Sequence, residues 1–87
     1  MRGVEVLNKR VVTSGGIELG RVVDVILDDS GERPVGFDVR CGDGSHRFLP
    51  FPTARIGGEH VEVDSPFMLL EREQLAFYRE RGRALRS

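Results

Sequence analysis

The stretch Gly16-Ile17-Glu18-Leu19-Gly20-Arg21-Val22-Val23-Asp24-Val25-Ile26-Leu27-Asp28-Asp29 decides the fold of this chain. It begins at a glycine turn, is rich in valine and isoleucine, and ends in Asp28-Asp29-Ser30-Gly31, a sequence typical of turns. The pattern predicts one long strand that leads into a hairpin. Apolar residues occupy both faces of its first half and one face of its second half, which suits a curled sheet.

The rest of residues 1–65 consists of short apolar segments separated by turns. In segment 34–41, apolar residues alternate with polar ones, which predicts a strand whose Asp38 and Arg40 face solvent. Further strands are expected at 4–7 and 10–13, interrupted at Asn8-Lys9, and at 46–51 and 60–64. The residues expected to face the core are Val23, Val25, Leu27, Val35, Phe37, Val39, Cys41, Phe48, Val61 and Val63.

Several short strands with frequent turns predict a small antiparallel barrel or sandwich, and a closed barrel would leave no unpaired strand edge. Pro50 and Pro52 lack the N–H groups that a strand ladder needs. The strand at 46–51 should therefore end at an edge or bend there.

The motifs also resemble a known family. They are Gly16-x-x-Leu19-Gly20-x-Val22-x-Asp24-Val25-x-Leu27-Asp28, Leu7-Asn8-Lys9-Arg10-Val11-Val12, Pro34-Val35-Gly36-Phe37-Asp38-Val39-Arg40, Phe48-Leu49-Pro50-Phe51 and His60-Val61-Glu62-Val63-Asp64. Their order and spacing resemble the PRC-barrel family, the small β-barrels of photosynthetic reaction-centre H subunits and ribosome maturation factors. The resemblance implies an antiparallel barrel of about six strands, provided that the segments around Arg10 and Ile56 both pair. It also implies a structural signature at Gly20, Asp24 and Asp28.

Asp24 is an acid within an otherwise apolar strand. Burying a carboxylate without partners is unfavourable, so Asp24 should either accept hydrogen bonds from backbone N–H groups of a neighbouring turn or face solvent at a bulge. We favour a structural role for this residue over a binding role.

Length and charge limit the classes of protein that fit. The 87 residues are expected to form one β-barrel over 1–65, followed by a C-terminal segment at 66–87 that packs on the barrel or on a partner. A net charge of −1 supplies no global field that would attract nucleic acid. The sequence contains neither a membrane-length apolar stretch nor a signal-peptide pattern, so we expect no membrane insertion and a cytoplasmic location. The single cysteine, Cys41, requires no oxidising compartment.

The C-terminal segment has a different composition. Ser65-Pro66 could cap a helix, but residues 66–70 are equally compatible with an extended segment. Good helix formers at 71–81, with Gly82 after them, predict a helix. Because its apolar residues fall on several sides, one barrel wall cannot cover them all, and we expect a homodimer or another protein partner. The interaction surface predicted in this way is Phe67, Met68, Leu70, Leu75, Phe77 and Tyr78.

No pattern in the sequence indicates catalysis, a cofactor or a metal. His60, Glu62 and Asp64 should share one face of a strand, and the outer face of an amphipathic strand is the simpler interpretation. A non-enzymatic protein-interaction or scaffold module is therefore the favoured function. The alternative is an RNA-associated factor of ribosome maturation, in which Arg79, Arg83 and Arg86 would form a basic stripe if the helix continued past Gly82.

Overall fold

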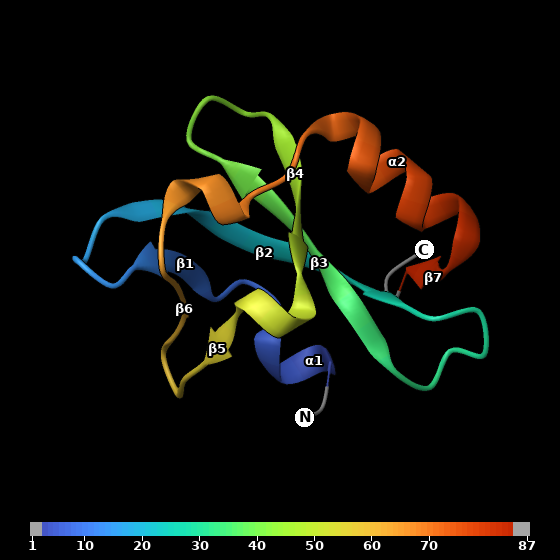
Figure 1. The fold of residues 1–87 in the computed structure, drawn as a ribbon. Coiled ribbons are helices and arrows are strands. Elements are labelled where there is room, and N and C mark those ends of the chain that lie inside the picture. The colour runs from blue at the N-terminus through green and yellow to red at the C-terminus, as the bar shows by residue number, and fades with distance from the viewer. Residues whose placement is uncertain (1–2, 85–87) are drawn as a thin grey trace.

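The structure, a computed structural model, describes residues 3–84 of the chain (Figure 1). It is mainly β, with one C-terminal helix of ten residues. The elements are α1 (Gly3–Val6), β1 (Arg10–Thr13), β2 (Glu18–Leu27), β3 (Pro34–Cys41), β4 (His46–Pro50), the 3-10 turn η1 (Phe51–Thr53), β5 (Arg55–Ile56), β6 (His60–Val63), the 3-10 turn η2 (Pro66–Met68), α2 (Arg72–Arg81) and β7 (Arg83–Ala84).

Six strands form a curled mixed sheet in the order β4-β3-β2-β1-β6-β5, and β7 pairs with the end of β2. The segments around Arg10 and Ile56 both pair, as the six-strand prediction required. The expectation of a closed, wholly antiparallel barrel is wrong in two respects. Strands β1 and β6 are parallel, and within residues 3–84 the two outermost strands, β4 and β5, do not pair with each other.

Both departures have a physical cause. A parallel pair needs a long connection, which the chain between β1 and β6 supplies by building four other strands. The sheet stays open because Pro50 ends β4 and Pro52 lies in η1, the 3-10 turn that takes the chain out of the ladder before β5.

The N-terminus also differs from the prediction. Residues 4–7 were expected to be a strand, but Gly3–Val6 form a short helical turn. Asn8 then adopts a positive φ of 71°, and its N–H donates to the carbonyl of Val22. Asparagine tolerates this left-handed conformation better than most residues. The turn places Val6 in the interior, where it is fully buried.

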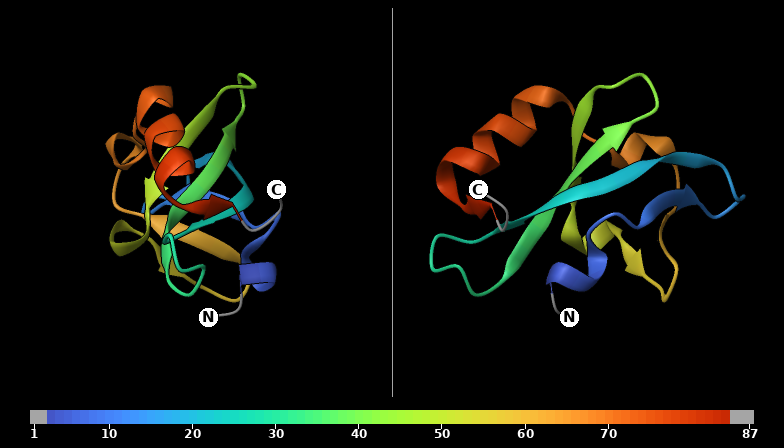
Figure 2. Two further views of the ribbon diagram at one scale, coloured as in Figure 1. Left: turned by 90° about the vertical axis from the view of Figure 1, so that its right-hand side faces the viewer. Right: turned by 180° about the vertical axis from the view of Figure 1, so that it is seen from behind.

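Two apolar clusters hold the fold together. The inner core lies within the curl of the sheet and consists of Val6, Val11, Val22, Val25, Phe37, Val39, Leu49, Val61 and Val63. The helix-side core lies between the sheet and α2 and is built on Ile26, Phe48 and Leu75, with Val35, Leu70 and Tyr78 against them. Figure 2 shows α2 at one end of the sheet, away from the β1–β2 hairpin.

The predicted core is correct for Val25, Phe37, Val39, Val61 and Val63, which all belong to the inner core. Leu27 and Cys41 are partly buried against the inner core. Val35 and Phe48 belong to the helix-side core. From β4 it is Leu49, and not Phe48, that lies in the inner core.

Val23 was also expected inside, but it is only half-buried. The cause is a bulge in β2: Val22 pairs with Val39 and Asp24 with Asp38, so Val23 is the extra residue. An extra residue reverses the alternation of side chains along the strand. As a result Val22 and Val25 point inward, and Asp24 lies on the outer face.

The C-terminal segment agrees with the prediction in outline. Ser65 caps η2, because its hydroxyl accepts the N–H of Phe67 at 3.2 Å, and Leu70 then forms an antiparallel bridge with Phe48. Segment 66–70 is therefore helical first and extended afterwards. The helix ends at Arg81, and Gly82 is extended. A Cβ atom on Gly82 would lie 2.1 Å from the carbonyl oxygen of Leu27, so glycine is needed for β7 to reach β2.

Candidate functional site: the outer face of the sheet

Helix α2 covers one half of the outer face of the sheet. Asp24 of β2, Asp38 of β3 and Phe48 of β4 form a row across this half, because Asp24 is opposite Asp38 and Asp38 is opposite Phe48. The ring of Tyr78 from α2 stacks on Phe48 at 4.4 Å between centroids. Both aspartates are buried, with 5% of Asp24 and 2% of Asp38 exposed.

Arg79 provides the positive charge between these two carboxylates. Its Nη2 atom lies 2.5 Å from Oδ2 of Asp38 and 3.4 Å from Oδ2 of Asp24. Oδ1 of Asp24 accepts the N–H of Val25 at 2.9 Å, and Oδ1 of Asp38 lies 2.8 Å from Nδ1 of His46. A buried carboxylate requires such partners, and α2 supplies the strongest of them.

The sequence analysis anticipated this arrangement only in part. Asp24 does accept a backbone N–H, but from Val25 of its own strand and not from a neighbouring turn. It does lie at a bulge, but it is buried there, and another partner is on a distant helix. The prediction that Asp38 faces solvent is wrong. Alternation placed Asp38 correctly on the face opposite Phe37, but α2 covers that face. Arg79 follows Leu75 by four residues and therefore lies on the apolar face of the helix. An arginine at such a position indicates a buried acidic partner, which the sequence analysis missed.

The two other signature residues shape the strand ends. A Cβ atom on Gly20 would lie 2.3 Å from the carbonyl oxygen of Arg40, so a side chain there would separate β2 from β3. Asp28 closes the β2–β3 hairpin. The hydroxyl of Ser30 donates to its carboxylate at 2.7 Å and lowers the pKa of Asp28, and the N–H groups of Glu32 and Arg33 lower it further.

The predicted interaction surface divides into covered and exposed residues. Leu70, Leu75 and Tyr78 lie in the helix-side core, and Met68 packs against the inner core. Phe67 is 88% exposed and Phe77 is 46% exposed. The guanidinium of Arg81 lies 4.6 Å from the centre of the Phe77 ring.

The predicted basic stripe does not form one helical face. It required the helix to pass Gly82, but α2 ends at Arg81 and Arg83 lies in β7. Arg79 is engaged by the two buried aspartates. Arg86 lies outside the described residues.

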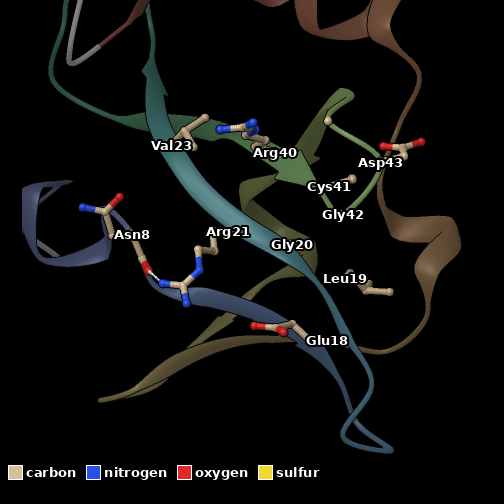
Figure 3. A pocket seen from close by; sticks show the side chains of 11 residues that line it. Asn8, Glu18, Leu19, Gly20, Arg21, Val23, Arg40, Cys41, Gly42 and Asp43 are labelled. Atoms are coloured by element: carbon tan, nitrogen blue, oxygen red, sulfur yellow. Dashed lines mark hydrogen bonds between the residues drawn. The ribbon is translucent and has the colours of Figure 1, made fainter.

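The other half of the outer face is not covered by α2 and carries arginines, which the sequence analysis did not single out. Arg10 lies opposite Arg21, and Arg21 lies opposite Arg40, so three arginines cross β1, β2 and β3 in a row. Arg21 and Arg40 line an open depression of about 720 Å³ that extends to Asn8 and the loop at 42–44 (Figure 3). No pattern in the sequence identifies this row, because its three arginines align only through the register of the strands.

The row His60, Glu62 and Asp64 does not form a cluster around a metal. Arg55 contacts Glu62 at 2.8 Å and Asp64 at 2.8 Å, and these two acids raise the pKa of Arg55. Among residues 3–84, no three histidine, cysteine or acidic side chains are grouped as metal ligands would be.

No helix within residues 3–84 has the length and apolar character needed to span a membrane.

The fold and the outer face define a small β domain in which a C-terminal helix packs on a curled sheet and forms ion pairs with two buried aspartates. The model of the PRC-barrel domain matches residues 1–69, and the chain belongs to the PRC-barrel family. Among curated proteins, none matches the chain.

Proposed function

We propose that this chain is a non-enzymatic protein-interaction module that docks through Phe67. The observation that carries the proposal is the exposure of this ring, 88%, on a turn that is otherwise well held. A large aromatic side chain presented to solvent on a small domain is typical of an interaction site.

The contacts around Phe67 support a presented side chain. The Ser65 hydroxyl caps the turn by accepting the Phe67 N–H, and the Met68 N–H donates to the Ser65 carbonyl at 3.1 Å. Met68 and Leu69 pack against the inner core. Because its neighbours are anchored inward, Phe67 is directed outward by the fold and needs little ordering when a partner binds.

The partner that we propose is a second copy of the chain. Phe77 is a further exposed aromatic residue that could be covered in a two-fold assembly. Four of the six residues first assigned to the interface already pack on their own sheet, so the buried area is modest. We therefore expect a weak, concentration-dependent dimer, since stable interfaces bury roughly 1,200–2,000 Å².

Light scattering over a range of protein concentrations tests this proposal. The wild type should rise from the monomer mass of 9.7 kDa toward twice that mass. Phe67→Ser and Phe77→Glu should both remain monomeric. Ile17→Ser is the matched control, because Ile17 is also an exposed apolar residue, at 64%, but lies in the β1–β2 hairpin.

A wild type that stays at 9.7 kDa at every concentration would exclude the dimer and leave a separate protein as the partner. Equal loss of association in Ile17→Ser would show that Phe67 has no particular role. Arg79 is not suited to contact RNA, because its guanidinium already contacts two buried carboxylates.

A further inference from the structure

We propose that the arginine pair, Arg21 and Arg40, binds an extended acidic segment of a partner protein. The two residues lie directly opposite each other on β2 and β3 and line the open depression of Figure 3. None of the lining residues belongs to η2 or α2, so this site is independent of the docking proposed for Phe67.

The position of the arginine pair is unfavourable for the isolated domain. Like charges directly opposite on adjacent strands repel each other, and Arg10 adds a third positive charge opposite Arg21. Arg10 has Glu18 at 3.9 Å to offset its charge. Among the described residues, no carboxylate forms an ion pair with Arg21 or Arg40, so their charges are available to a ligand.

The side chains leave room for two carboxylates. Nη1 of Arg21 donates to the carbonyl of Asn8 at 3.3 Å, whereas Arg40 extends toward Val23 (Figure 3). Val23, half-buried, also lines the depression and offers an apolar contact. Acidic side chains on one face of an extended peptide recur about every 6.8 Å, and each can accept a bidentate pair of hydrogen bonds from one guanidinium.

Nucleic acid fits the same surface less well. A single strand is usually held by aromatic rings on which its bases stack, and the depression is lined by no aromatic residue. Glu18 and Asp43 also belong to the lining and repel any anion that reaches them, so the acidic segment contacts only the part of the depression at Arg21 and Arg40. Two arginines are few compared with the roughly 6–10 phosphate contacts of a typical nucleic-acid protein.

The test is fluorescence anisotropy with a labelled peptide of alternating glutamate and serine. The wild type should bind it, and binding should weaken as the salt concentration rises from about 50 mM to about 300 mM. Arg21→Gln and Arg40→Gln should each reduce the affinity by about tenfold, the effect expected for losing a charge-assisted hydrogen bond. Arg33→Gln is the matched control, because Arg33 is an exposed arginine of the β2–β3 hairpin outside the depression.

Further measurements make the result decisive. The corresponding glutamine–serine and lysine–serine peptides should not bind, and circular dichroism should show that all variants are folded. The proposal is overturned if the acidic peptide does not bind, if Arg33→Gln loses as much affinity as Arg40→Gln, or if a single-stranded oligouridine binds more tightly than the peptide. It is also overturned if Arg21→Gln and Arg40→Gln abolish self-association, because a second copy would then be the occupant.

Discussion

Asp24 of β2 and Asp38 of β3 lie opposite each other beneath helix α2, and one guanidinium, that of Arg79, contacts both. Helix α2 is therefore held to the sheet by charge as well as by the helix-side core. Buried carboxylates need a cation nearby, and the helix that buries these two also supplies that cation.

Replacing Arg79 by Met should destabilise the domain by about 2–4 kcal/mol, because it leaves two buried carboxylates without their cation. The value is below that of a fully buried pair, since the Arg79 side chain is 35% exposed. Urea unfolding should show a lower midpoint. Arg81→Met, on the exposed side of the same helix, is the control and should unfold near the wild-type midpoint, within about 0.5 kcal/mol. Equal midpoints for both variants would refute a role for the buried charges.

The two aspartates should not be equivalent. Asp38 contacts Arg79 more closely than Asp24 does and also contacts His46. Asp38→Asn should therefore lower the free energy of unfolding by about 1–3 kcal/mol and Asp24→Asn by less. Neither variant should change self-association under conditions where it is folded. Unchanged stability together with lost association in Asp24→Asn would instead assign Asp24 a binding role.

Gly20→Ala should destabilise the domain by about 1–3 kcal/mol, since the new Cβ would overlap the backbone of β3 rather than a movable side chain. Chemical denaturation measures the change. The matched substitution is Gly42→Ala, because nothing lies within 4 Å of a Cβ at that position. If the two variants were equally stable, the close approach of β2 and β3 at Gly20 would not be real.

Phe37→Ala should cost about 3–5 kcal/mol, a large part of the stability of a small domain. The reason is that Phe37 is fully buried in the inner core and packs near Phe51, at 6.0 Å between ring centroids. Phe67→Ala removes the same ring from an exposed position and should change stability by less than about 0.5 kcal/mol. Similar unfolding midpoints for these two variants would contradict the orientation of β3.

Asp28 should contribute to the acid sensitivity of the hairpin. Its folded pKa lies below the ordinary value of 3.8, so its contribution to stability is present above that value and is lost as the pH falls through the folded pKa. Ser30→Ala should raise the pKa of Asp28, because the Ser30 hydroxyl is the main cause of the lowered value. Titration by NMR measures the pKa directly. Ser45→Ala removes the hydroxyl beside Asp43 in the next hairpin and should leave the pKa of Asp28 unchanged. A Ser30→Ala variant with the wild-type pKa would contradict this account.

Local patterns in the sequence predicted most of the elements. The alternation at 34–41 placed Phe37 and Val39 inside. At Ser65-Pro66 the sequence left a capped helix and an extended segment open, and the structure has a capped 3-10 turn there. The helix predicted at 71–81 differs by one residue from Arg72–Arg81. Each of these predictions depends on residues that are neighbours in the chain, so the sequence contains the information directly.

The sequence by itself therefore determined a mainly β domain of several short strands with a C-terminal helix, because strand alternation, turn chemistry and capping are local properties. The number of six strands was implied by the resemblance to the PRC-barrel family. Only the tertiary structure decided that the sheet stays open, that Val22 replaces Val23 in the inner core, and that Asp38 is buried. It also decided that Arg79 binds two buried carboxylates, while Arg21 and Arg40 have no carboxylate partner within residues 3–84. The physical reason is that a bulge, a strand register and the docking of a helix bring together residues far apart in the chain, and partners at such distances determine whether a charge is buried or available.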